Sequence, residues 1–78
     1  MITKEQAMQL RVGDVVRHTS LKMHDGKPMH AVVTATAHVD KPGSEYYDAK
    51  YFSVAVQNPK VHRALEITNY TCHNWEVA

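Results

Sequence analysis

The sequence is poor in cysteine and glycine, with one cysteine, Cys72, and three glycines among 78 residues, and it has no long hydrophobic run. A single cysteine excludes an internal disulfide and any zinc site that needs two thiolates from one chain, and it favours a reducing cytoplasm. The three isolated glycines exclude the glycine-rich loops that cradle phosphate groups. No apolar run approaches the roughly 20 residues of a membrane-spanning helix. We therefore expect no membrane partner.

The sequence also lacks a strong excess of either charge. Nine lysines and arginines stand against eight aspartates and glutamates, which gives a net charge of +1. The positive field of a general nucleic-acid binder is therefore missing, and any nucleic-acid contact would have to come from a local patch. Hydrophobic residues make up 44% of the chain and charged residues 22%, as in globular domains. We expect residues 1–78 to form one small domain.

The start of the chain has the signature of a short helix. Thr3 and Gln6 have the spacing of a capping box, in which two side chains satisfy free backbone N–H groups reciprocally. We predict a helix over residues 4–10, with Ala7 and Leu10 buried on one side. So short a helix is not stable alone and must pack against another element.

An alternation of apolar and polar residues predicts a long strand over residues 29–39. Successive side chains of a strand point to opposite faces, so this pattern indicates one buried face and one exposed face. The dipeptide Asp25-Gly26 favours a tight hairpin turn before this strand, which would join it to a first strand that begins near Val15. The residues predicted to be buried are Met29, Ala31, Val33, Ala35, Ala37 and Val39.

Three shorter strands are predicted later in the chain, over residues 50–57, 65–68 and 75–77. Residues 69–74, between the last two, suit a single helical turn. The residues expected on the inner faces are Phe52, Val54, Val56, Trp75 and Val77.

This order of elements resembles the SH3-like small barrels over residues 12–78, with five short strands joined by turns and a helical turn before the last strand. An OB-type barrel is the alternative, but that fold normally places a helix between its third and fourth strands, where this chain has only residues 58–63. The resemblance implies a mainly β fold, a five-stranded SH3-like small barrel with a short N-terminal helix. It rests on element order and implies no activity.

Six histidines raise the question of a metal site, because imidazole is a common ligand of zinc, copper and nickel. His30 and His38 share a face of the predicted strand, but eight residues place them about 26 Å apart, too far for one ion. His18 could neighbour His30 across the hairpin, but a third ligand is not evident. Cys72 and His73 are adjacent and point apart in extended structure, so they form no dyad. We therefore expect no metal, no cofactor and no catalytic residue.

An enzyme built at an oligomer interface is one alternative, because the length and the expected barrel are similar to those of the plasmid-type dihydrofolate reductases. These small SH3-like chains assemble around a central pore that is lined by a Val-Gln-Ile-Tyr strand. The nearest equivalent here is residues 65–68, where Glu66 replaces the glutamine and Thr68 replaces the tyrosine. The resemblance therefore does not extend to the residues that would carry the activity.

Aromatic and basic residues in one loop and in the first hairpin are the candidates for binding. Aromatic faces beside cations are typical of base-stacking surfaces and also of protein hot spots. The alternative is that the tyrosines cover an end of the barrel and the cations are solvated surface. Lys60 and Arg63 form a second basic cluster. The predicted binding residues are Tyr46, Tyr47, Tyr51, Lys41 and Lys50 in the loop, and Arg17, Lys22 and Lys27 in the hairpin.

Residues 1–7 and 67–77 resemble the ends of short open reading frames in bacteriophages and prophages, which implies a bacterial or phage-infected cytoplasm. The favoured hypothesis is a non-enzymatic macromolecule-binding module, a phage- or mobile-element-derived accessory protein that docks on a protein. Near-neutral charge gives little counterion release, so a nucleic-acid-binding accessory protein is the alternative. The end of the long strand could project and pair with a second copy, so we also expect a homo-oligomer.

Overall fold

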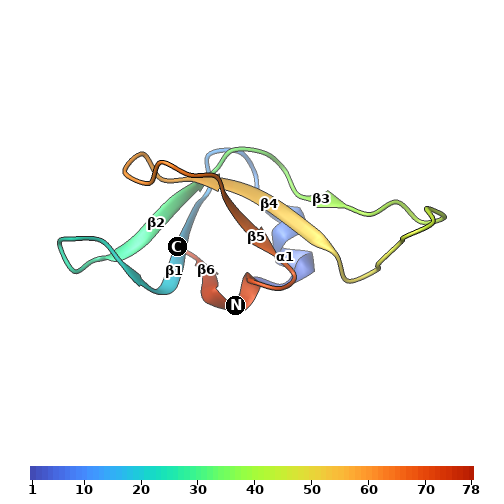
Figure 1. The fold of residues 1–78 in the computed structure, drawn as a ribbon, viewed down its shortest axis with the longest axis horizontal. Coiled ribbons are helices and arrows are strands. Elements are labelled where there is room, and N and C mark those ends of the chain that lie inside the picture. Colours follow the sequence, from blue (N-terminus) through green and yellow to red (C-terminus); the bar gives the residue numbers. More distant parts are fainter.

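Six antiparallel strands form one curled sheet in the computed structural model, which describes residues 1–78 (Figure 1). Helix α1 (Lys4–Gln9) precedes the sheet, and a single 3-10 turn, η1 (Cys72–Asn74), precedes the last strand. The predicted mainly β fold with a short N-terminal helix is confirmed, with six strands in place of five. The strands are β1 (Val15–Lys22), β2 (Pro28–Val33), β3 (His38–Val39), β4 (Phe52–Gln57), β5 (Leu65–Thr68) and β6 (Trp75–Val77).

The sheet runs in the order β3-β4-β2-β1-β6, with β5 also paired to β4. Val56 of β4 pairs with Val33 of β2 and with Leu65 of β5, so β2 and β5 occupy opposite edges of β4. β5 and β6 each have one paired neighbour, and the curled sheet is therefore a half-barrel. This shape is compatible with a small barrel, and the narrower SH3-like assignment stays a prediction.

The long strand predicted over residues 29–39 is interrupted in the structure. β2 ends at Val33 and β3 begins at His38. Thr34 still donates its N–H group to the carbonyl oxygen of Ala55 in β4 at 3.0 Å, and residues 35–37 interrupt the strand. Ala35 is exposed, and the prediction of a buried side chain there is wrong. Burial of one methyl group contributes only about 0.8 kcal/mol, so Ala35 does little to hold the pleat. The remaining positions of this face are the buried Met29, Ala31 and Val33 and the half-buried Ala37 and Val39.

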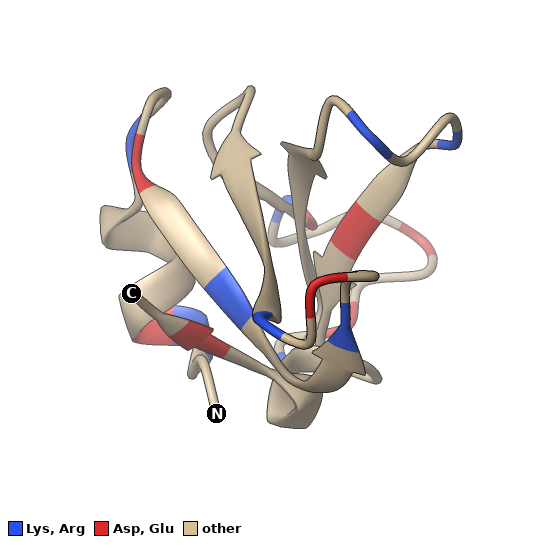
Figure 2. Cartoon of the chain, turned by 90° about the vertical axis from the view of Figure 1, so that its left-hand side faces the viewer, with Lys and Arg blue, Asp and Glu red and all other residues tan.

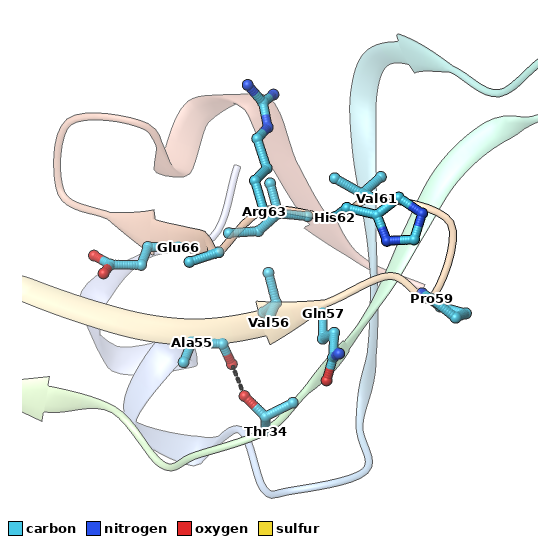
Figure 3. A pocket seen from close by; sticks show the side chains of 11 residues that line it. Thr34, Ala55, Val56, Gln57, Pro59, Val61, His62, Arg63 and Glu66 are labelled. Atoms are coloured by element: carbon cyan, nitrogen blue, oxygen red, sulfur yellow. Dashed lines mark hydrogen bonds between the residues drawn. The ribbon is translucent and has the colours of Figure 1, made fainter.

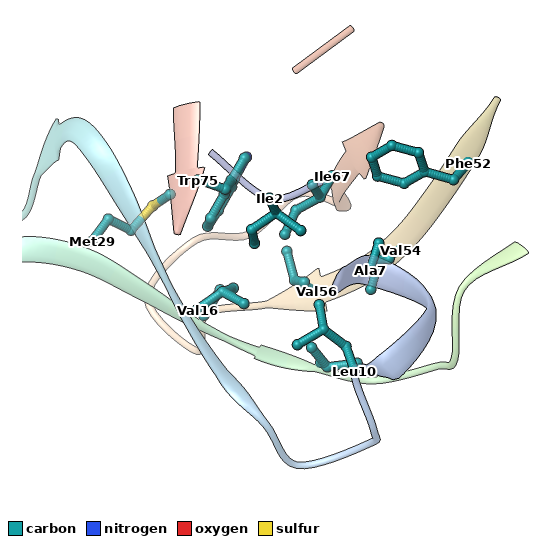
Figure 4. Close-up of a cluster of buried hydrophobic side chains, with 12 residues drawn as sticks. Ile2, Ala7, Leu10, Val16, Met29, Phe52, Val54, Val56, Ile67 and Trp75 are labelled. Atoms are coloured by element: carbon teal, nitrogen blue, oxygen red, sulfur yellow. The ribbon is translucent and has the colours of Figure 1, made fainter. Parts of the chain in front are cut away.

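One hydrophobic core fills the inner side of the curled sheet (Figure 4). The N-terminal segment closes it: Ile2 is fully buried, and its N–H group donates to the carbonyl oxygen of Cys72 at 3.0 Å. The predicted inner residues of β4 are all buried. The twelve core residues are Ile2, Ala7, Leu10, Val16, Met29, Ala31, Val33, Phe52, Val54, Val56, Ile67 and Trp75.

The capping box at the start of α1 forms as predicted. The N–H group of Gln6 donates to Thr3 Oγ1 at 3.1 Å, and the N–H group of Thr3 donates to Gln6 Oε1 at 2.9 Å. Ala7 and Leu10 are buried, as expected, although the helix ends at Gln9. The capped turn therefore presents its apolar side to the core.

The last strand confirms one prediction in full and another in part. Trp75 of β6 is buried, and Val77 lies on the same face of the strand but is 49% exposed, so the face is as predicted and the burial of Val77 is incomplete. β6 pairs with β1 alone, and Val77 lies opposite Val16 at the end of the chain. No further strand covers this position, which leaves the side chain half in solvent.

The molecule is elongated, with extents of 46, 20 and 19 Å. Figure 1 shows the β1–β2 hairpin and the β4–β5 loop at one end of the long axis, and the connection between β3 and β4 at the other end. Neither helix has the length and the apolar character that crossing a membrane requires. The loops at the two ends carry most of the predicted binding residues.

Candidate functional site

The structure divides the predicted binding residues between the two ends of the long axis (Figure 1). Residues 40–51, between β3 and β4, carry Lys41, Lys50 and the three predicted tyrosines, and we call them the tyrosine loop. Lys22 and Lys27 lie in the β1–β2 hairpin at the opposite end, and Arg17 lies further back in β1. The hairpin cations therefore do not join the tyrosines in one site.

The tyrosine loop is a series of hydrogen-bonded turns. The N–H groups of Ser44, Tyr47 and Tyr51 each donate to the carbonyl oxygen three residues earlier, at 3.1 to 3.2 Å. The Oδ2 atom of Asp40 accepts a hydrogen bond from the N–H group of Asp48 at 3.1 Å, which ties the start of the loop to its later part. A loop held in this way loses less conformational entropy when it binds.

Helix α1 gives the tyrosine loop a second anchor. The ammonium group of Lys4 donates to the carbonyl oxygen of Ala49. Next to this contact, Asp48 Oδ1 accepts from the N–H group of Lys50 at 2.9 Å. The loop is thus attached to the helix as well as to the strands that it joins.

The tyrosines of this loop differ in exposure. Tyr46 is 85% exposed and Tyr47 is 45% exposed. Tyr51 is half-buried, and its ring meets the ring of His38 edge-on with the centroids 6.3 Å apart. Tyr51 therefore supports the loop, whereas the other two rings are available to contact another molecule.

The tyrosine loop has no excess of positive charge. Lys41 and Lys50 stand against Asp40, Glu45 and Asp48, so the loop carries one net negative charge. Local electrostatics at this end therefore do not favour a phosphate backbone.

Arg17 belongs to neither end, because it is already paired. Its Nε lies 2.8 Å from Glu76 Oε1 of the neighbouring strand β6. The two residues are opposite each other in the β1–β6 ladder, and both side chains are partly exposed. The pair neutralises the charge of Arg17, which leaves it out of the set of free cations.

Two segments that are distant in the sequence meet at the end opposite the tyrosine loop. Lys27 and His30 of the β1–β2 hairpin line one open hollow together with Asn58 and Lys60 of the β4–β5 loop. Asn58 joins the two segments: its Nδ2 donates to the carbonyl oxygen of His30 at 2.6 Å, and its Oδ1 accepts from the N–H group of Lys60 at 2.8 Å. Asn58 is also the one buried polar residue of the structure.

We call residues 22–30 and 58–63 the basic end. This end holds four of the nine lysine and arginine side chains and one of the eight aspartate and glutamate side chains, so its net charge is +3 and that of the remaining chain is −2. Figure 2 looks onto this end and shows lysine or arginine in both of its segments. The charged residues are Lys22, Lys27, Lys60, Arg63 and the single carboxylate, Asp25.

A second hollow continues the basic end toward β5. It is lined by Thr34, by the end of β4 and by the β4–β5 loop, and it shares Gln57 and Pro59 with the first hollow. In Figure 3 the side chain of Arg63 points away from the sheet, and that of Glu66 points in a different direction. The two hollows therefore form one continuous surface, along which Arg63 is free of a carboxylate partner.

His18 has a structural role that sequence reasoning missed. Its Nδ1 accepts hydrogen bonds from the N–H groups of Ser20 at 3.1 Å and Leu21 at 2.9 Å, where the β1–β2 register shifts. Its ring packs edge-on against Trp75 with the centroids 5.0 Å apart. Partial burial lowers the pKa of His18 below its ordinary value. The neutral imidazole therefore stabilises the irregular part of β1.

The remaining side chains that could act as nucleophiles or metal ligands lie apart from one another or make local hydrogen bonds. The thiol of Cys72 donates to the carbonyl oxygen of Asn69 at 3.6 Å, and His73 is exposed. No three histidine, cysteine, aspartate or glutamate side chains come close enough together to hold a metal ion.

No protein-family model, no curated protein and no solved structure matches this chain. The two ends of the molecule are its candidate sites. Sequence composition indicates the tyrosine loop, but it does not indicate that Lys27 and Lys60 line one hollow, because only strand pairing brings their segments together.

Proposed function

We propose that this protein is a non-enzymatic binding module that docks on another protein through the tyrosine loop. The observation that carries the proposal is the exposure of Tyr46 and Tyr47 on a loop whose backbone is held by its own turns, by Asp40 and by Lys4. A tyrosine ring offers a large contact area with few rotatable bonds, so it loses little entropy on binding. Aromatic anchors of this kind dominate the energetics of protein interfaces.

The charge of the tyrosine loop supports a protein partner over a nucleic acid at this end. Base stacking on tyrosine needs a positively charged track for the adjoining phosphates, whereas this loop carries one net negative charge. Protein interfaces have no such requirement, because aromatic residues are enriched in their centres and charged residues are depleted there.

The wider setting is part of the proposal. The resemblance of both ends of the sequence to phage reading frames supports an accessory protein of phage or mobile-element origin in a bacterial cytoplasm. The half-barrel is compatible with a place among the SH3-like small barrels.

Self-association through β3 accompanies this proposal. β3 pairs with β4 alone, which leaves the outer edge of His38 and Val39 open to a strand from a second copy. An active site shared between chains would require such an oligomer. Light scattering that shows a strict monomer would exclude both the oligomer and the shared site.

The proposal is tested by capture from bacterial lysate on immobilised protein, followed by mass spectrometry. The variant Tyr46→Ala/Tyr47→Ala removes both exposed rings and is expected to lose the specifically captured protein. An aromatic hot spot contributes about 2 kcal/mol or more, which corresponds to at least a roughly 30-fold weaker dissociation constant.

Tyr70→Ala is the matched control, because Tyr70 is 76% exposed but lies in the turn between β5 and η1. It should capture the same protein as the wild type. If the loop variant and the Tyr70 variant capture the same set of proteins with equal yield, the tyrosine loop is not the docking surface.

A further inference from the structure

We propose that the basic end binds the phosphate backbone of duplex DNA, independently of the tyrosine loop. In the sequence, the cations of the hairpin and of residues 60–63 form two separate clusters. In the structure, Lys27 and Lys60 line the same hollow, and Arg63 lines the adjoining one. The fold thus brings two small clusters together at the basic end, where residues 22–30 and 58–63 carry a net charge of +3. Glu66, just beyond these residues, adds one carboxylate to the lining of the second hollow.

The cations of this surface have no carboxylate partners. The structure contains one ion pair, Arg17 with Glu76, and it lies outside the basic end. Asp25 accepts a hydrogen bond from the N–H group of Lys27 at 3.0 Å and so serves the hairpin turn. Glu66 of β5 lines the second hollow together with Arg63 but forms no ion pair with it. The four positive charges are therefore free to attract an external polyanion.

The two segments are also fixed relative to each other. Asn58 bonds to the backbone of both segments, as described above. In the hairpin, the N–H group of Met23 donates to the carbonyl oxygen of Lys27 and that of Gly26 donates to Met23, both at 2.9 Å. The backbones that carry the cations are therefore ordered before any ligand arrives, which lowers the entropic cost of binding.

The composition of the basic end favours phosphate over a protein partner. Lysine is depleted in protein interfaces, where aromatic residues are enriched. Three of the four cations here are lysines, and no tyrosine, tryptophan or phenylalanine lines either hollow. Lysine acts as a point charge that suits phosphate oxygens, so the surface is typical of backbone contact.

The same absence of large aromatic rings distinguishes duplex from single-stranded nucleic acid. Single strands are held by stacking of bases on aromatic side chains as well as by charge, and the basic end has none of the three residue types that stack best. Across its long axis the whole molecule measures 20 by 19 Å, which is the upper bound for the width of this end. At 3.4 Å per base pair this end faces at most about six base pairs of a duplex, which is long enough for four phosphate contacts.

The test is a fluorescence anisotropy titration of a labelled mixed-sequence duplex against the wild-type protein over a range of salt concentrations. Each phosphate contact contributes about −0.9 to the slope of log K against log salt. Four contacts predict a slope of about −3.6, which is a loss of roughly 150-fold in affinity between about 50 and 200 mM salt.

Lys27→Gln/Lys60→Gln removes two of the contacts and should reduce the slope to about −1.8. The matched control is Lys41→Gln/Lys50→Gln, which changes the net charge equally but lies in the tyrosine loop. This control should keep the wild-type slope. All four side chains are exposed, so both variants should fold, which circular dichroism verifies.

Several results would overturn the proposal. One is the absence of any anisotropy change at low salt, and another is an equal reduction of the salt slope in the two double lysine variants. The others are tighter binding of a single strand of the same length and competition by polyglutamate that is as strong as competition by unlabelled duplex. Tyr46→Ala/Tyr47→Ala should bind the duplex like the wild type, so failure of the protein-docking proposal and failure of this one give different results.

Discussion

The two ends of the molecule offer different chemistry on loops that are fixed by similar means. The tyrosine loop presents two exposed tyrosine rings and one net negative charge, whereas the basic end presents four unpaired cations and no tyrosine, tryptophan or phenylalanine. Each is held by a side chain that bonds to the backbone of another segment, Lys4 at one end and Asn58 at the other. The backbone is therefore ordered at both ends, and the exposed side chains determine which kind of partner each end can bind.

The sheet separates these ends along an axis of 46 Å. The hydrophobic core lies between them, so an exposed residue of one end can be changed without touching the other. The comparison predicts that most variants affect one end only. A variant that removes the core affects both.

The largest effect is expected from Val33→Asp. Val33 is fully buried in β2, so the variant places an unpaired charge in the core, which costs more than about 4 kcal/mol. A domain of this size has roughly 5 to 15 kcal/mol of stability at most, so the variant should be largely unfolded and should lose both binding activities. Thermal melting followed by circular dichroism measures this.

Val32→Asp is the matched control for that variant. Val32 is the next residue along β2, but it is 40% exposed on the outer face. Its melting temperature should remain close to that of the wild type. If Val33→Asp melts cooperatively at the same temperature as Val32→Asp, the assignment of faces in β2 is inverted.

Asn58→Ala is expected to have the next largest effect, confined to the basic end. The variant removes the hydrogen bond that joins the β4–β5 loop to His30 of β2 and the bond to Lys60 within the loop, which should lower the free energy of unfolding by about 1 to 3 kcal/mol. It should also weaken duplex binding, while capture through the tyrosine loop persists. Urea unfolding and the anisotropy titration give both values.

Asn69→Ala serves as the asparagine control, because Oδ1 of Asn69 is buried without a hydrogen-bond partner. Removal of the Asn69 side-chain amide should lower the free energy of unfolding by less than removal of the Asn58 side-chain amide. Equal destabilisation by the two variants would show that Asn58 does not join the segments.

Stability is expected to fall in acid because of His18. Burial holds the pKa of His18 below its unfolded value, so the unfolded chain binds this proton at a higher pH than the folded chain. The contribution is complete above about pH 6.5 and is lost as the pH falls through the lowered folded pKa. A proton on Nδ1 also removes the acceptor for Ser20 and Leu21.

Urea unfolding of the wild type and of His18→Gln at a series of pH values checks this prediction. The variant should have a lower free energy of unfolding than the wild type at neutral pH. Its free energy of unfolding should also fall less steeply as the pH is lowered. Identical pH profiles for the two proteins would mean that His18 is not the group responsible.

The smallest effect is expected from Lys4→Met. It removes the exposed hydrogen bond to Ala49, and surface changes of this kind alter stability by less than about 0.5 kcal/mol. Amide exchange in residues 44–51 should nevertheless become faster, while exchange in the β1–β2 hairpin stays constant. Lys41→Met, which lies in the loop but has no such bond, should leave both unchanged. Faster exchange at both ends in Lys4→Met would contradict the independence of the ends.

Much of the fold could be predicted because local patterns decide it. The capping box of Thr3 and Gln6 forms, and the period-two pattern places Met29, Ala31 and Val33 in the core. The pattern fails where its side chains are small or lie at an edge. Ala35 gains little from burial and leaves the strand, and β6 has no outer neighbour to cover its end.

The sites were predictable only where their residues are close in sequence. The tyrosine loop lies in one stretch of twelve residues, so composition alone indicated it. The basic end depends on the pairing of Val32 with Gln57, which brings β2 beside the end of β4. No local sequence pattern predicts this register between β2 and β4. The buried position of Asn58 depends on the same pairing, so no local pattern indicates it either.

The most direct test of the separation of the two ends is the duplex titration of Tyr46→Ala/Tyr47→Ala beside Lys27→Gln/Lys60→Gln. The tyrosine variant should show the wild-type affinity and salt dependence, while the lysine variant loses about half of the salt dependence. A loss of duplex binding in the tyrosine variant as large as that in the lysine variant would contradict the account, because the two ends would then form one surface.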